Sequence, residues 1–214
     1  FGAVLRRRST TARAEIFRAE GRYVEAEGAF RKALAANEIF LQQQAGSEQV
    51  LAFDRESPER ARHFNEILQR SLASTLATQG KLTEAEVFAR RALQGALERV
   101  GRDSTDTALG LSLLASILSE EGRHAEAVRL AEESLRSFQM AGTSEDSVFA
   151  SGARKNLASA MVALGGYKEA IAIFERNREA LKTNPELWKK VGSGHLDWVL
   201  AMLRTGDQAA AERM

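Results

Sequence analysis

Three serines occupy the same place in three successive stretches of the chain, and they are the residues best placed to contact a ligand. Each follows a Leu-Ala pair and has a polar or basic residue four positions earlier, on the same face if the stretch is helical. With these neighbours, the candidate binding residues are Arg70, Ser74, Ser112, Ser116, Lys155, Asn156 and Ser159. Hydroxyls, an amide and two cations could hold an extended peptide backbone. The alternative is that serine is a small residue tolerated there for close packing.

Other residue types do not combine into a catalytic or metal site. The chain has no cysteine, so thiolate ligands and nucleophiles are absent from its sequence. None of its three histidines has a second ligand at helical spacing that would make a convincing metal site. The GSG at 192–194 lacks the other residues of a phosphate-binding motif. We therefore expect no catalytic residue, no metal and no cofactor, and a protein that is not an enzyme.

The overall charge excludes a global attraction to polyanions. Lys and Arg total 30 against 29 acidic residues, a net charge of +1. The Arg6–Arg8 run is a weak local candidate for binding nucleic acid or a partner, and a solvated face is its commoner role. No apolar run has the ~18 residues that a membrane span requires. We expect neither nucleic-acid nor membrane binding, and a cytoplasmic location; arginine-rich, lysine-poor composition suggests a bacterial source.

The elements that position these serines come from a repeat. A glycine followed five residues later by alanine recurs at Gly21, Gly80, Gly122, Gly165 and Gly206, with spacings of 59, 42, 43 and 41. Upstream of the middle three glycines, LASTL, LASIL and LASAM stand at one offset. Leu, Ala and Leu or Met at i, i+1 and i+4 form a single helical stripe. The glycine then supplies a left-handed C-cap before a second helix, whose alanine allows close backbone approach.

These helix pairs resemble tetratricopeptide repeats, and their length of about 42 residues is similar to that of the kinesin-light-chain class. The resemblance implies an all-α fold, a right-handed superhelical solenoid of about five antiparallel helix pairs. It also implies that the first helices line a concave groove, where chaperone-binding members hold a C-terminal carboxylate with lysines and asparagines. Only Lys155 and Asn156 match that pattern.

The sequence predicts one array over residues 1–214, with an irregular insert at about 45–56 that is a candidate for function. The expected repeats are 4–44, 57–100, 104–141, 145–182 and an incomplete 185–214. Their first helices are expected near 4–20, 57–79, 104–121, 145–164 and 185–204, and their second helices near 22–44, 81–99, 123–140, 167–181 and from 207. Ser-Pro-Glu from Ser57 and Asn-Pro-Glu from Asn184 are typical helix starts.

The terminal repeats depart from the pattern. Arg13 stands where the middle repeats have leucine, as an end repeat with less apolar cover would allow. In the last repeat, Trp198 and Val199 replace the Leu-Ala pair, and Trp198 is expected to pack in the core. Because only eight residues follow Gly206, the second helix of the last repeat is incomplete. We expect that the chain is a fragment of a longer protein.

The expected function is a non-catalytic protein-interaction scaffold that binds a peptide or partner domain in its concave groove. The alternative is a regulatory or sensor array that acts in cis on an attached catalytic domain, such as a CHAT-type protease. A further possibility is weak self-association of an otherwise monomeric chain through its terminal repeats.

Overall fold

The computed structural model describes residues 2–45, 57–180, 182 and 195–213. Over these ranges the chain forms ten α-helices and no strand, which confirms the all-α prediction. The predicted insert, the helix start at Asn184 and the GSG at 192–194 lie outside the described residues. The contacts divide the chain into two compact units, Phe1–Arg99 and Val100–Met214, which we describe separately.

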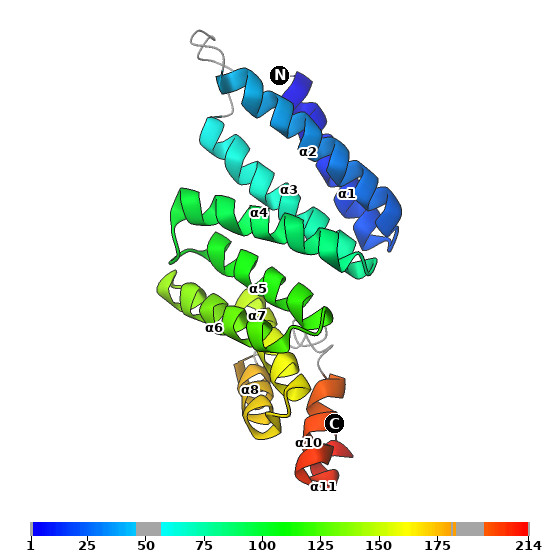
Figure 1. The fold of residues 1–214 in the computed structure, drawn as a ribbon, viewed down its shortest axis with the longest axis vertical. Helices are drawn as coiled ribbons and strands as arrows, with labels where there is room; N and C mark the ends of the chain where they lie inside the picture. Colours follow the sequence, from blue (N-terminus) through cyan, green and yellow to red (C-terminus); the bar gives the residue numbers. More distant parts are fainter. Residues whose placement is uncertain (1, 46–56, 181, 183–194, 214) are drawn as a thin grey trace. The chain divides into compact units, whose positions relative to one another are not determined.

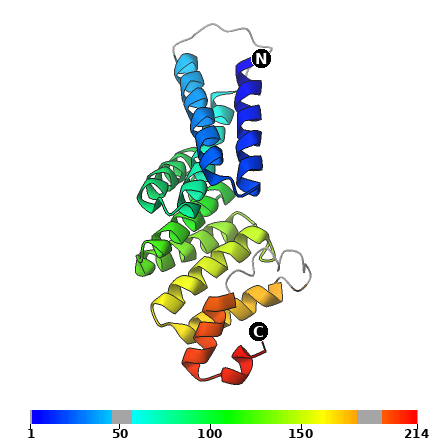
Figure 2. The ribbon, with the colours of Figure 1, turned by 90° about the vertical axis from the view of Figure 1, so that its right-hand side faces the viewer.

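The first unit contains four helices, arranged as two helix pairs (Figures 1 and 2). Their bounds are α1 (Gly2–Ala19), α2 (Tyr23–Ala45), α3 (Pro58–Thr78) and α4 (Leu82–Val100). Helices α1 and α2 lie side by side in opposite directions, as Figure 2 shows, and α2 also packs on α3. Ion pairs tie α2 to the second pair: Glu27 bonds Lys81 at 2.6 Å, and Arg31 bonds Glu84 at 2.6 Å.

The second unit continues the pattern of antiparallel pairs. Its helices are α5 (Thr105–Glu120), α6 (His124–Met140), α7 (Val148–Ala163), α8 (Tyr167–Ala180), α10 (His195–Thr205) and the short α11 (Gln208–Ala211). Each helix packs on the next described one, and the two first helices α5 and α7 also contact each other. The α5–α7 contact brings the candidate residue Asn156 against Ser112 of the neighbouring repeat.

Every predicted turn glycine adopts the left-handed conformation. The φ angles are 74° at Gly21 and Gly80, 81° at Gly122, 82° at Gly165 and 86° at Gly206. At the first middle turn, the Gly80 amide donates to the Ala77 carbonyl and the Lys81 amide to Leu76, which satisfies two carbonyls at the end of α3. A residue with a Cβ is strained at such φ values, so the glycine recurs.

The helix starts are also fixed by local side chains. Ser57 caps α3 by accepting a hydrogen bond from the Arg60 amide at 3.2 Å, with Pro58 in the first turn as predicted. Ser104 and Ser147 cap α5 and α7 in the same way, through the amides of Thr107 and Ala150. Because Ser147 is the cap, α7 begins at Val148 rather than at the expected residue 145.

The core is built from the repeated leucines and alanines. The alanines that follow the leucine stripe and those that follow the turn glycine are almost wholly buried: Ala26, Ala73, Ala85, Ala115, Ala127, Ala158 and Ala170. Their small side chains let paired helices approach, while Leu72, Leu76, Leu114 and Leu118 fill the space between them. Trp198 is buried and stacks on Phe174 with ring centroids 5.5 Å apart, which confirms its packing role.

The arginines near the start of the chain correct one expectation. Arg7 does not lie on a solvated face: its residue is 2% exposed, its guanidinium lies 4.0 Å from the Phe40 ring centre, and it donates to Asn37. Arg7 therefore joins α1 to α2 and is not available to a partner. Arg13, by contrast, is exposed on α1, where it lies over Phe17.

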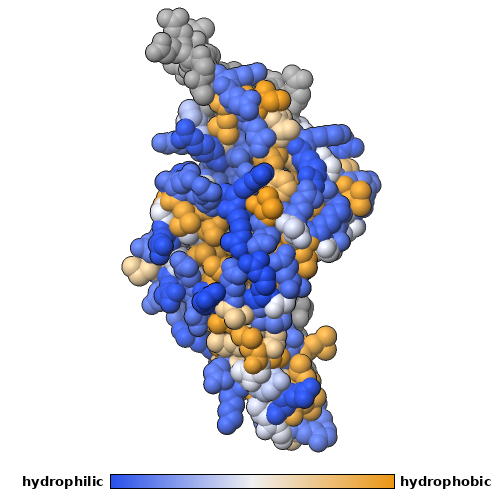
Figure 3. All heavy atoms as spheres, in the orientation of Figure 1, coloured by the Kyte–Doolittle hydropathy of each residue, from blue (hydrophilic) through white to orange (hydrophobic). Residues whose placement is uncertain are grey.

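The surface mixes hydrophilic and hydrophobic side chains within each unit (Figure 3). The exposed large hydrophobic residues on α10 are Leu196, Leu200 and Leu203. Among the described residues, no helix combines the length and apolar character that crossing a bilayer demands.

Candidate functional site

Helices α5 and α7 of the second unit, which pack on each other, carry five of the seven predicted binding residues, which we call the α5–α7 face: Ser112, Ser116, Lys155, Asn156 and Ser159. The two helices meet directly at Asn156, whose amide donates to the Ser112 carbonyl at 3.1 Å and to the Ser112 hydroxyl at 3.2 Å. The sequence spacing alone did not predict this bond. It fixes Asn156 as a link between repeats and engages Ser112.

The carboxylate of Glu120 lies near the predicted cation Lys155 on this face. Protein packed around Glu120, at the end of α5, raises the pKa of its carboxyl, and the positive charge of Lys155 on α7 opposes that rise. Sequence reasoning missed Glu120 because it belongs to a different helix from Lys155. The face thus presents one charge of each sign beside neutral hydroxyl and amide groups. An extended peptide, whose backbone both donates and accepts hydrogen bonds, is compatible with such a mixture.

The hydroxyls of Ser116 and Ser159 differ in their surroundings. Ser116 is half-buried. Ser159 is also half-buried, but its Oγ is closed off from solvent and has no hydrogen-bond partner among the described residues. A hydroxyl in that position cannot meet a ligand without moving, so Ser159 fits the close-packing alternative better than a direct contact.

The remaining two predicted residues lie on α3 in the first unit. Arg70 and Ser74 are half-buried and stand four residues apart, on one face of the helix. The carbonyl of Ser74 accepts a hydrogen bond from the Thr78 hydroxyl at 3.0 Å. These two residues therefore form a separate polar strip within their own unit.

Two of the three histidines lie close to polar side chains of their own repeats. His63 Nδ1 lies 3.8 Å from a carboxylate oxygen of Glu66, but Arg99 already binds both oxygens of that carboxylate, at 2.7 to 3.2 Å. His124 begins α6 and lies 3.4 Å from the Ser119 hydroxyl. The engagement of Glu66 by an arginine disfavours its use as a metal ligand.

The comparisons with known proteins agree with this architecture. Residues 65–140 match the family model of the tetratricopeptide repeat. They include α4, α5 and α6 with two of the turn glycines. Within that range, the chain has the sequence pattern of tetratricopeptide repeats. A search of curated protein sequences gave no match.

Solved structures with this fold cover almost all of the chain. The crystal structure of BtubC (BKLC) from P. vanneervenii has a TM-score of 0.69 at 20% identity, covering 94% of this chain and 73% of that one. A putative kinesin light chain from Podosopora anserina with nearly identical TPR-like repeats, solved as a variant, gives 0.69 at 17%, covering 96% and 89%. A second structure of that protein gives 0.65 at 17%, with coverage of 96% and 90%. At such identities the likeness establishes the fold.

One buried cation in the array escaped the sequence prediction. Arg154 on α7 is 5% exposed. It precedes its turn glycine by the same distance as Gln69 and Leu111 precede theirs, and both of those residues are buried and neutral. A comparison of the three middle repeats could have identified Arg154, because a charged residue stands there at a position that is neutral in the other two repeats. Charged residues are rarely buried without a specific reason.

Proposed function

We propose that this tetratricopeptide array is a non-catalytic scaffold that binds a peptide or a partner domain through the exposed faces of its first helices. The α5–α7 face of the second unit carries the proposal, because the Asn156–Ser112 bonds bring a serine-lined helix directly beside the helix that bears Lys155. Its small, neutral side chains leave room for a peptide backbone. In the first unit, Arg70 and Ser74 on α3 provide a second, separate polar contact strip.

The residues on the α5–α7 face have different roles in this proposal. Lys155 attracts an acidic group of the partner, and Glu120 attracts a cationic group. Ser116 offers a hydroxyl, whereas Ser159 contributes by being small, since its Oγ is closed off from solvent. Non-catalytic binding is typical of the repeat family and of this fold, and we extend that property to this chain.

Charge reversal at Lys155 tests the proposal. In a quantitative pull-down with the 214-residue chain as bait, Lys155→Glu should lose at least about three-quarters of a partner captured by the parent chain, because a close like-charge contact disfavours association. Arg70→Glu tests the strip on α3 separately. The matched control is Arg129→Glu on α6, an exposed arginine outside this face. Equal capture of every partner by the parent chain and Lys155→Glu would rule out the α5–α7 face.

We also propose that the chain is monomeric or only weakly self-associating, with the contact on α10. The observation is the exposure of Leu196 and Leu203 on that helix, at 83% and 51%. Replacing both by glutamine should remove any concentration dependence of the scattered mass in light scattering. A concentration dependence that survives in the double variant would place the contact elsewhere.

A further inference from the structure

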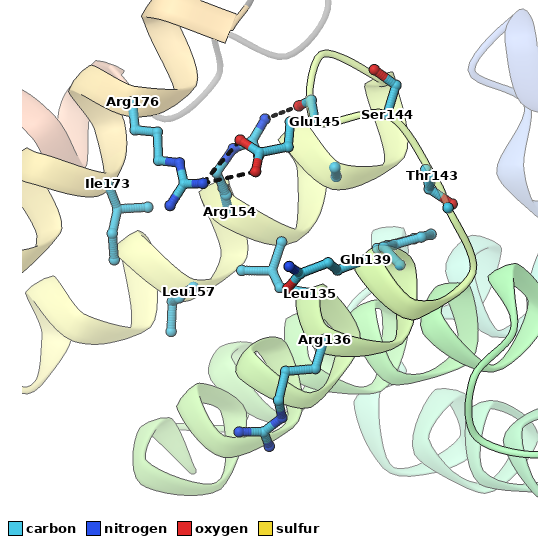
Figure 4. A pocket seen from close by; sticks show the side chains of 13 residues that line it. Leu135, Arg136, Gln139, Thr143, Ser144, Glu145, Arg154, Leu157, Ile173 and Arg176 are labelled. Atoms are coloured by element: carbon cyan, nitrogen blue, oxygen red, sulfur yellow. Dashed lines mark hydrogen bonds and ion pairs between the residues drawn. The ribbon is translucent and has the colours of Figure 1, made fainter.

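A pocket of about 520 Å³ lies in the second unit between the end of α6, the segment before α7, and α7 with α8 (Figure 4). Leu135, Leu157 and Ile173 provide its apolar wall. Arg154 and Leu157 lie on the side of α7 away from Ser159, because successive helical residues turn by about 100°. This pocket, which we call the Arg154 pocket, is therefore distinct from the α5–α7 face.

The polar groups of the pocket are mainly cationic. Among the described residues, its lining includes Arg136, Arg154 and Arg176 but a single carboxylate, Glu145. Arg176 binds both oxygens of Glu145 at 2.9 Å, and Figure 4 shows this pair at the edge of the apolar wall. Both side chains of the pair are about two-thirds exposed, at 65% and 66%. An ion pair so open to water contributes little and is readily exchanged for another anion.

Arg154 is the unusual member, because its positive charge is buried and its hydrogen bonds go to neutral groups. Its Nε donates to the Asn177 side chain at 3.0 Å, and its Nη2 donates to the backbone carbonyl of Glu145. Burial lowers the pKa of the Arg154 guanidinium, and the Glu145 charge only partly offsets this. An arginine carries five N–H donors, so hydrogens remain for a further acceptor.

A bound anion would supply what this arginine lacks. A planar carboxylate matches the fork of a guanidinium, and hydrogen bonds between two charged groups are the strong ones. The volume is in the range of small-molecule sites, which are mostly apolar with a few convergent polar groups. The apolar wall then requires that the anion carry an apolar body.

We propose that the Arg154 pocket binds a small organic carboxylate, whose charged end contacts Arg154 and Arg176 and whose apolar body packs on Leu135, Leu157 and Ile173. Glu145 competes with the ligand for Arg176 and leaves it when the carboxylate enters. This site is independent of the proposed peptide-binding face, so either can fail without the other.

Octanoate is a suitable probe, with octanamide as its neutral counterpart and acetate as the same charge without the apolar body. We expect octanoate to bind the 214-residue chain at least about tenfold more tightly than either, measured by calorimetry, because only octanoate meets both requirements. In NMR titrations, the amide signals of Leu157 and Ile173 should shift. Equal affinity for octanamide, or equal affinity for acetate, would overturn the proposal.

Three variants sharpen the test. Arg154→Gln places the residue found at the equivalent position 69 and should weaken octanoate binding about tenfold. Glu145→Gln removes the competitor and should strengthen binding about threefold. Arg129→Gln, outside the pocket on α6, should leave binding unchanged.

The first two variants should change the affinity for octanoate in opposite directions, which a general loss of structure would not do. If circular dichroism shows that Arg154→Gln does not fold, the comparison between Glu145→Gln and Arg129→Gln decides. Unchanged or weaker octanoate binding in Glu145→Gln would contradict the competition, and unchanged binding in folded Arg154→Gln would remove the site. Lys155→Glu, the variant of the α5–α7 face, should retain octanoate binding, so the two sites fail separately.

Discussion

Replacing Leu118 by alanine is expected to lower the free energy of unfolding by about 3 kcal/mol, within the range for deleting a buried leucine side chain and leaving a cavity. Leu118 on α5 is fully buried, in the same helical stripe as the buried Leu114 and Ala115. Because these helices are packed at alanine positions, the backbones have little room to close the cavity.

Urea unfolding followed by far-ultraviolet circular dichroism measures this loss. Leu164→Ala at the end of α7 is the matched control, since the same chemical change is made where the residue is 55% exposed. It should change stability by less than about 0.5 kcal/mol. Equal effects of the two substitutions would mean that the leucine stripe is not the core of the second unit.

Replacing Asn177 should give the second large loss of stability, because its side chain accepts a hydrogen bond from the buried guanidinium of Arg154. The residue is 4% exposed on α8, accepts hydrogen bonds from Arg154 Nε at 3.0 Å and from the Ser151 hydroxyl at 2.8 Å, and donates to the Ser151 carbonyl. Asn177→Leu removes the acceptor of the Arg154 Nε and of the Ser151 hydroxyl. The cost of one unsatisfied buried group is about 1–3 kcal/mol, and more if it is charged, so we expect a loss of about 3 kcal/mol.

The preceding repeat provides the comparison for this variant. Ser134 stands at the equivalent distance from its turn glycine, is fully buried, and donates a hydrogen bond at 2.7 Å to the Ala108 carbonyl. Ser134→Ala should therefore cost only about 1 kcal/mol. Adding Arg154→Leu to Asn177→Leu should recover part of the loss in a double-mutant cycle, because the stranded charge is removed. Additive losses in that cycle would argue against the coupling.

The residues that repeat were enough to predict most of the helical framework. Gly80 and Gly122 adopt the positive φ that their recurrence predicted, and the LASTL and LASIL stripes are buried as their spacing required. Such features can be inferred from sequence because each depends on local conformation or on a helical period. The family resemblance drawn from the same residues is confirmed by the match over residues 65–140.

The binding residues were less predictable. The sequence named Ser112 and Asn156 as candidate binding residues, but only the packing of α5 on α7 showed that they bond each other. The same packing places Glu120 within the electrostatic influence of Lys155. The assignment of the seven residues to ligand binding remains a prediction that the Lys155 and Arg70 variants will test.

The sequence by itself therefore determined the helical framework, the turns and the alanine contacts of this protein, since these depend on local conformation and periodicity. The tertiary structure decided which of the non-repeating polar side chains are buried and which groups they bind. Arg7 carries no sequence sign of burial, and Arg154 carries only its offset within the repeat. Their partners Asn37 and Asn177 stand 30 and 23 residues away along the chain. The energy of a long, charged side chain is set by the groups that surround it in the fold, and those groups come from other helices.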